Sequence, residues 1–140
     1  MQRLEFDQDF SVPVERIYAF LAEHENLGLI FAPMKVERLT DGTDSRNGVG
    51  SSRTLTLAGQ APFVETVTEA TPNERIVYKI TKGSPLKNHQ GVLEFSSTPT
   101  GSHLHYTIEF ASKIPGIDVM VAQGLKRGVA KGLSKVEAAA

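Results

Sequence analysis

The chain has 140 residues, of which 40% are hydrophobic and 22% charged, so its composition excludes a disordered, collagen-like or coiled-coil protein. Fifteen basic and sixteen acidic residues leave a net charge of -1, which provides no overall attraction to nucleic acid or anionic lipid. The lack of cysteine excludes disulfide scaffolds, thiolate zinc sites and cysteine nucleophiles.

The N-terminal segment alternates in polarity. The even positions of residues 2–12 carry Leu4, Phe6, Phe10 and Val12, a period of two that predicts a half-buried strand. No basic region is followed by an apolar run, so we see no signal peptide, and no apolar stretch approaches the length of a membrane span. We therefore expect a cytoplasmic protein without membrane insertion.

Two short helices are predicted next. Residues 13–25 begin with a proline and carry apolar side chains at the spacing of an amphipathic helix, namely Val14, Ile17, Tyr18, Leu21 and Ala22. Residues 26–33 are apolar and short, and they predict one or two further helical turns that end before Pro33.

Six further strands follow, separated by residues that favour tight turns. Asp-Gly, Ala-Gly-Gln, Thr-Pro-Asn, Lys-Gly-Ser-Pro and Thr-Pro-Thr-Gly lie between the strand-like runs. This order predicts an antiparallel meander with strands at residues 35–39, 50–57, 62–70, 75–81, 86–97 and 103–111.

A long helix is predicted after Pro115 and Gly116. Apolar residues recur there at helical spacing, namely Ile117, Val121, Leu125, Val129, Leu133 and Val136. One face of the sheet must cover this helix, so the pattern predicts an α+β fold. We expect residues 1–140 to form a single domain.

Several segments together resemble a known family. They are the stretch from Phe10 to Leu27 (FSVPVERIYAFLAEHENL), the region from Gly48 to Arg53, Glu65, the strand Arg75-Ile-Val-Tyr78, and Gly101. The chain resembles, over nearly its whole length, the polyketide cyclase/dehydrase-like branch of the START (SRPBCC, Bet v 1-like) superfamily. The resemblance implies a helix-grip fold, in which a curved seven-stranded antiparallel sheet grips the last helix. A cavity between them holds lipids, sterols, quinones, plant hormones or polyketides in this superfamily, and some members cyclise or dehydrate the bound chain.

Two charged residues are predicted to meet on the inner face of the sheet. A three-residue connection at 58–60 sets Leu57 opposite Ala61, and this register places Arg53 opposite Glu65. Buried charges are costly unless they pair and hydrogen-bond. The pair would then be a polar anchor for a ligand or a structural ion pair, and the sequence leaves both interpretations open.

The strand pattern also turns His89 and Tyr78 inward. With Glu65 they are the candidate catalytic residues, because an imidazole, a phenol and a carboxylate can exchange protons during aldol-type cyclisation or dehydration. The alternative is structural, since inward tyrosines are usually core residues with a bonded hydroxyl and His89 lies near the irregular start of its strand.

Three glycines in the last helix recur at every fourth position, namely Gly124, Gly128 and Gly132. Each costs about 1 kcal/mol of helix stability relative to alanine, so we expect them to leave room for a ligand or to permit close packing. Together with the strand pattern, these observations predict a ligand site lined by Arg53, Leu55, Phe63, Glu65, Tyr78, His89, Leu93, Phe95, Tyr106, Ile108, Gly124 and Gly128.

The other histidines and the basic residues of the last helix are assigned no function. His103 and His105 fall on the outer face of their strand with no third metal ligand evident, and we expect them to be solvated. His24 is expected to interact with the end of the first helix. The basic residues are expected to form a solvated face, namely Lys126, Arg127, Lys131 and Lys135.

The sequence therefore predicts binding of a hydrophobic small molecule, such as a lipid, quinone or polyketide, for transport, sensing or storage. The alternative is a polyketide cyclase/dehydratase-type enzyme that uses acid/base residues in the same cavity. A third possibility is an interaction module that binds a macromolecular partner at the sheet edge or the basic helix face. We expect no cofactor, no metal and no nucleic-acid partner, and the oligomeric state stays open, with a dimer as one alternative.

Overall fold

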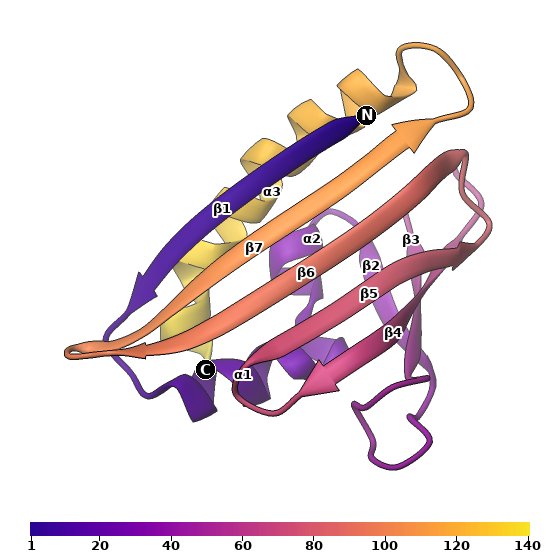
Figure 1. Cartoon of the computed structure of the whole chain (residues 1–140). Helices are drawn as coiled ribbons and strands as arrows, with labels where there is room; N and C mark the ends of the chain where they lie inside the picture. Colours follow the sequence, from indigo (N-terminus) through magenta and orange to yellow (C-terminus); the bar gives the residue numbers. More distant parts are fainter.

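The computed structural model describes residues 1–140 and contains the elements in the predicted order (Figure 1). The strands are β1 (Gln2–Phe10), β2 (Lys35–Thr40), β3 (Ser52–Thr56), β4 (Phe63–Thr71), β5 (Arg75–Lys82), β6 (Leu86–Thr98) and β7 (Gly101–Ser112). The helices are α1 (Val14–Ala22), the 3-10 turn η1 (His24–Asn26), α2 (Gly28–Phe31) and α3 (Ile117–Ala139). The first helix is shorter than predicted, since it ends at Ala22 and leaves residues 24–26 to a separate turn.

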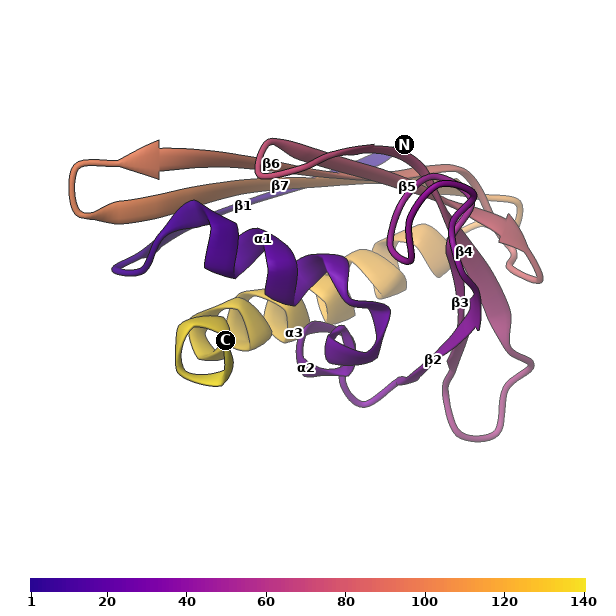
Figure 2. The same ribbon diagram turned by 90° about the horizontal axis from the view of Figure 1, so that it is seen from below.

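The seven strands form one antiparallel sheet in the order β1-β7-β6-β5-β4-β3-β2. Strands β2 to β7 are therefore neighbours in chain order, and β1 pairs with β7 at the far edge. Figure 2 shows that the sheet bends and that α1, α2 and α3 all lie on its concave side. The predicted α+β helix-grip fold is confirmed.

Irregularities in four strands bend the sheet. The pairing register shifts once between β2 and β3, twice between β4 and β5, and once between β6 and β7, with the extra residues on β2, β4, β5 and β6. An extra residue on one strand of an antiparallel pair bends that strand and increases the local twist. The outer strands β2 to β4 consequently curve away from the long pair β6 and β7, as Figure 2 shows.

Helix α3 packs most closely over its C-terminal half, where four of its five buried residues lie. Its buried residues are Ala122, Val129, Gly132, Leu133 and Val136, whereas Val119 and Met120 in its first turns are exposed. A methyl group at Gly132 would lie 2.5 Å from the Cα atom of Ile30, so this glycine lets α3 touch α2. The N-terminal half of α3 makes no such contact, which leaves space between it and the sheet.

None of the helices combines the length and the hydropathy that crossing a bilayer requires.

Candidate functional site

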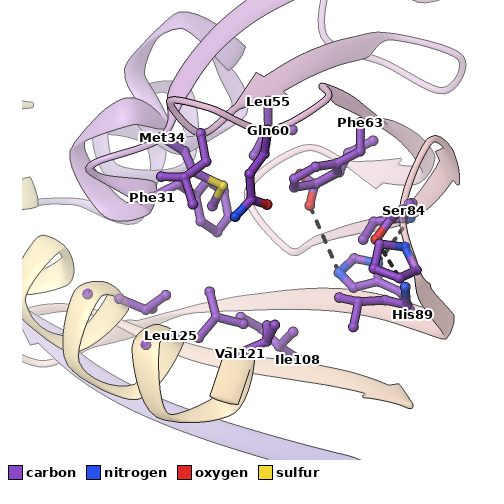
Figure 3. A pocket seen from close by; sticks show the side chains of 18 of the residues that line it. Phe31, Met34, Leu55, Gln60, Phe63, Ser84, His89, Ile108, Val121 and Leu125 are labelled. Atoms are coloured by element: carbon purple, nitrogen blue, oxygen red, sulfur yellow. Dashed lines mark hydrogen bonds and ion pairs between the residues drawn. The ribbon is translucent and has the colours of Figure 1, made fainter. Parts of the chain in front are cut away.

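A cavity of about 510 Å³ lies between the sheet and the N-terminal half of α3. Its wall is mostly hydrophobic, with 17 apolar residues among the 26 that line it. Figure 3 shows Val121 and Leu125 of α3 on one side and Phe31, Met34 and Leu55 on the other. This volume lies within the range of small-molecule sites, which combine apolar walls with a few polar groups.

The cavity reaches the surface beside the N-terminal half of α3, between two turns of the sheet and the segment after α2. Exposed lining residues come from the β3–β4 and β5–β6 turns, from the segment after α2 and from the first turns of α3, namely Ala32, Pro33, Gln60, Ala61, Gly83, Pro85, Met120 and Gly124. Buried and half-buried residues of β3 to β5 also line the cavity, namely Leu55, Phe63, Glu65, Tyr78 and Ile80. The cavity is therefore open to solvent at these exposed segments.

The predicted pairing of Arg53 with Glu65 is confirmed. The two residues are register partners on β3 and β4, and Nε of Arg53 donates to Oε1 of Glu65 over 2.8 Å. Both side chains are almost completely buried. Glu65 lines the cavity, but the expectation that both charges project into it is wrong, because Arg53 extends behind Glu65 into the core. There its guanidinium lies 4.6 Å from the centre of the Tyr78 ring.

His24 is part of this buried polar group, and the expected contact with the helix terminus is wrong. Its imidazole is fully buried, with Nδ1 3.3 Å from Nη1 of Arg53 and Nε2 3.0 Å from Oγ of Ser51. A guanidinium only donates, so Nδ1 accepts and Nε2 carries the proton that bonds Ser51. The physical reason for the change is Glu23, whose extended backbone ends α1 and turns the next side chain into the core.

Burial keeps His24 uncharged. Desolvation, reinforced by the positive charge of Arg53, lowers the pKa of His24 to about 3. The hydroxyl of Ser51 passes the hydrogen bond on to the carbonyl oxygen of Gly48 over 2.6 Å. Arg53 thus donates to Glu65 on one side and to His24 on the other. From His24 the hydrogen bonds continue through Ser51 to Gly48 in the β2–β3 loop.

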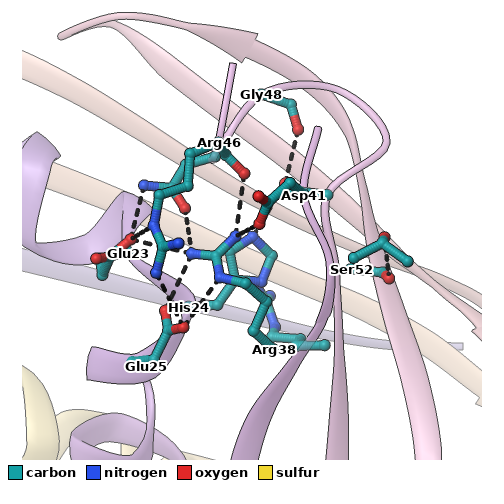
Figure 4. A network of polar contacts seen from close by, with 12 residues as sticks. Glu23, His24, Glu25, Arg38, Asp41, Arg46, Gly48 and Ser52 are labelled. Atoms are coloured by element: carbon teal, nitrogen blue, oxygen red, sulfur yellow. Dashed lines mark hydrogen bonds and ion pairs between the residues drawn. The ribbon is translucent and has the colours of Figure 1, made fainter. Parts of the chain in front are cut away.

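A group of ion pairs outside His24 holds this turn in place. Figure 4 shows the carboxylates of Glu23 and Glu25 meeting the guanidinium groups of Arg38 and Arg46. The distances are 3.0 Å from Arg38 to Glu23, 2.9 Å from Arg38 to Glu25, and 3.0 and 3.1 Å for the same carboxylates to Arg46. The hydrogen bond from Arg38 lowers the pKa of Glu25 to about 2. These contacts join η1 to β2 and to the β2–β3 loop.

His89 faces the cavity although its strand is irregular there. Asn88 has a φ of 54°, and the pairing of β6 with β7 shifts between Lys87 and Gln90. Nδ1 of His89 accepts the backbone N–H of Ile80 over 3.0 Å, so in the neutral ring the proton lies on Nε2. Burial lowers the pKa of His89, which favours this neutral form at pH 7.

The hydroxyl groups of the two inward tyrosines form a hydrogen bond with each other. Tyr78 and Tyr106 are fully buried, and their hydroxyls are hydrogen-bonded. Burial raises the pKa of both phenols, so they stay protonated. Tyr78 lines the cavity through its ring, which lies across Gly91 of the neighbouring strand, where any Cβ would collide with it. Tyr106 lies behind that wall.

Eight of the residues predicted to line a ligand site lie in the cavity wall, namely Leu55, Phe63, Glu65, Tyr78, His89, Ile108, Gly124 and Gly128. Four lie in the core beyond it, namely Arg53, Leu93, Phe95 and Tyr106. Phe95 illustrates the reason, because α1 covers this part of the sheet. The ring of Phe95 packs edge-on against that of Tyr18 in α1, with 5.1 Å between the ring centres. The role of the eight in ligand binding stays a prediction.

Of the part of the wall that comes from the helices and the turns, the sequence singled out only Gly124 and Gly128. Phe31 and Met34 line it beside α2, and Val121 and Leu125 line it from α3. The apolar row of α3 has the pattern of a packing stripe, but its first half faces the cavity instead of a core. The signal that distinguishes the halves is the nearby pair Gly124 and Gly128, since neither glycine has a neighbour close enough to resist a side chain.

The two outer histidines do lie on the outer face of β7, and carboxylates of β1 pair with them. Nδ1 of His103 lies 2.7 Å from Asp9, and Nδ1 of His105 lies 2.9 Å from Asp7. The hydrogen bonds to Asp9 and Asp7 raise the pKa of His103. These cross-strand contacts give both histidines a structural partner, which the sequence pattern did not indicate.

Comparison with known proteins agrees with this geometry. A family model described as "Polyketide cyclase / dehydrase and lipid transport" matches residues 1–140. The chain belongs to this family. Membership supports a role in binding or cyclising a hydrophobic small molecule and does not decide between the two. No curated protein sequence matches the chain.

Solved structures share the fold at low sequence identity. The Zhui aromatase/cyclase from a Streptomyces species superposes with a TM-score of 0.74 at 19% identity, over 97% of this chain and 93% of that one. Protein TTHA0849 from Thermus thermophilus gives 0.76 at 16%, over 97% and 94%. Protein MLL2253 from Mesorhizobium loti gives 0.71 at 16%, over 97% and 94%. At these identities the likeness establishes the fold alone.

Proposed function

We propose that this protein binds one hydrophobic small molecule in the cavity and carries, stores or senses it without converting it. The observation that supports this is the cavity itself: about 510 Å³ with a predominantly apolar wall and an exposed mouth beside α3. Lipids, quinones and polyketides are molecules of the size and polarity that such a wall would accept.

The protonation state of His89 favours binding over turnover. A general base must offer a lone pair to the proton that it removes. The lone pair of Nδ1 is occupied by the amide of Ile80, and Nε2 carries a proton, so the neutral ring presents only a donor to the cavity. The hydroxyl of Tyr78 is likewise engaged with Tyr106. Of the three candidate catalytic groups, only Glu65 keeps an acceptor free.

The second candidate is a cyclase or dehydratase, and one observation favours it. Oε2 of Glu65 and Nε2 of His89 lie 3.9 Å apart in the same cavity, where a carboxylate and an N–H donor could act on one carbonyl-containing chain. In that case Glu65→Gln and His89→Phe would each abolish product formation from a polyketide-type substrate. Unchanged substrate recovered after long incubation with the wild-type protein, together with binding, supports the carrier.

A blocked cavity tests the proposal directly. Gly128 lines the cavity and its nearest potential contact is the carbonyl of Ala32 at 3.6 Å, so Gly128→Leu fills the cavity without a severe clash. Ala130 is exposed on the same helix outside the cavity, so Ala130→Leu is the matched control. A ligand at 100 times its Kd stabilises the protein by about 2.7 kcal/mol, or roughly 9 °C in Tm for a chain of this length.

We expect lipids, quinones or aromatic polyketides in a thermal-shift screen to raise the Tm of the wild type and of Ala130→Leu, and to leave that of Gly128→Leu unchanged. Native mass spectrometry of protein purified from its source should show a co-purifying small molecule in the wild type. A Tm that no apolar ligand changes, or an equal shift in Gly128→Leu, would contradict the proposal.

A further inference from the structure

Two buried polar atoms in the mostly apolar wall, Oε2 of Glu65 and Nε2 of His89, have no hydrogen-bond partner within the chain. Oε1 of Glu65 accepts from Arg53, but Oε2 accepts nothing, and Nε2 of His89 donates to nothing. The two atoms are 3.9 Å apart, beyond a direct hydrogen bond. Both side chains are about 95% buried, at 5% and 6% exposed, and no fully buried side-chain nitrogen or oxygen of the chain lacks a partner. The two free atoms therefore reach the cavity.

The hydrogen-bond directions around these atoms are fixed. The amide of Ile80 occupies Nδ1 of His89, which makes Nε2 a donor. Arg53 does not line the cavity; it donates from Nε to Oε1 of Glu65 and from Nη1 to Nδ1 of His24, which leaves Oε2 of Glu65 as a free acceptor. The buried part of the wall at Glu65 and His89 thus presents one donor and one acceptor, 3.9 Å apart.

A hydroxyl group complements this arrangement with a single oxygen. An oxygen about 2.8 Å from both atoms would subtend an angle of roughly 90° between them, which a hydroxyl that accepts one bond and donates another can adopt. A carbonyl or ether oxygen accepts only, and leaves the carboxylate of Glu65 without a donor. A ligand carboxylate also accepts only and places a second negative charge beside Glu65.

We propose that the cavity selects hydrophobic alcohols and phenols, whose hydroxyl oxygen accepts the Nε2 proton of His89 and donates to Oε2 of Glu65. The inference rests on the proposed function and specifies the polar end of its ligand. Phe31, Val121 and Leu125 contact the apolar remainder of the molecule, because they line the opposite part of the same cavity.

Four bicyclic probes of nearly equal size test this selection: 2-naphthol, 2-methoxynaphthalene, 2-methylnaphthalene and 2-naphthoate. Their Kd values are measured at pH 7 by fluorescence titration of the full chain. Because two buried hydrogen bonds are made or lost, we expect 2-naphthol to bind at least about tenfold more tightly than the ether and the hydrocarbon, and 2-naphthoate to bind most weakly. Equal Kd values for naphthol and ether would overturn the hydroxyl inference and leave the proposed function standing. Failure of all four to bind would overturn both.

Two variants separate the hydrogen bond from the shape of the wall. His89→Phe keeps an aromatic ring and removes the donor. The Kd of 2-naphthol should therefore rise about tenfold, to that of 2-methoxynaphthalene, while the Kd values of the ether and the hydrocarbon stay unchanged. Leu125→Ala removes apolar wall without touching the polar pair, so the four probes should weaken alike. A uniform loss across the probes in His89→Phe would show that the residue only shapes the cavity, and would refute the inference.

Discussion

The same substitution at two glycines of α3 should change stability in opposite directions. A methyl group at Gly124 would have no atom within 4 Å, whereas one at Gly132 would lie 2.5 Å from Cα of Ile30 and 2.6 Å from the carbonyl oxygen of Leu29. Both obstacles at Gly132 belong to the backbone of α2, so no side-chain rotation relieves them. Helix α2 would have to move.

The magnitudes follow from two separate effects. Gly→Ala in the interior of a helix gains about 1 kcal/mol through helix propensity, and this gain is common to both positions. Overpacking at Gly132 costs about 1–3 kcal/mol, and this cost is absent at Gly124. The difference between the two variants therefore isolates the steric cost. For a chain of 140 residues, 1 kcal/mol corresponds to roughly 3–4 °C, so the Tm of Gly132→Ala should lie about 3–12 °C below that of Gly124→Ala.

Urea unfolding followed by circular dichroism, together with calorimetric Tm values, measures both variants. We expect Gly124→Ala to unfold at a higher urea concentration than the wild type and Gly132→Ala at a lower one, with similar m-values. Gly128→Ala should behave like Gly124→Ala, because its nearest contact is an ordinary 3.6 Å. Equal stability of the alanine variants at 124 and 132 would refute the close contact of α3 with α2, and with it the division of this helix into a packed half and a cavity half.

Three further predictions concern the buried polar group and the strand beside it. The neutral state of His24 should make stability fall as the pH drops from 6.5 towards 3, because the unfolded imidazole takes up a proton there and the buried one, with a pKa of about 3, does not. This group changes the unfolding free energy by at most about 1.4 kcal/mol per pH unit. The difference in unfolding free energy between wild type and His24→Gln should therefore shrink as the pH falls. A difference that does not depend on pH would exclude a buried neutral imidazole. Arg53→Met leaves the buried carboxylate of Glu65 without its ion-pair partner and should lower the free energy of unfolding in urea by about 3–5 kcal/mol. The double variant Arg53→Met/Glu65→Leu should recover much of that loss. A double variant no more stable than Arg53→Met would contradict the cost of the unpaired charge. Gly91→Ala places a methyl group against the ring of Tyr78 and should lower the unfolding free energy by about 1–3 kcal/mol, and a neutral effect would show that the ring does not lie across the glycine.

Local pattern determined the order of the elements and one long-range contact. Period-two alternation located the strands, and the helical row after Pro115 located α3. The length of the β3–β4 turn, combined with strand parity, was enough to pair Arg53 with Glu65, because an antiparallel hairpin has only one register for a given turn. The order of the elements and the hairpin register are both determined by residues close together in the sequence.

Depth within the fold was decided only by the tertiary structure. Phe63 and Phe95 both point to the concave face, yet Phe63 lines the cavity and Phe95 lies under α1, because parity selects a face and not the element that covers it. His24 is buried because the chain turns at Glu23 and because Arg53, 29 residues away, supplies a donor that fits its ring. The residues next to His24 in the sequence do not indicate such a distant partner. The burial of this histidine could therefore be seen only in the tertiary structure, where distant strands and turns come together.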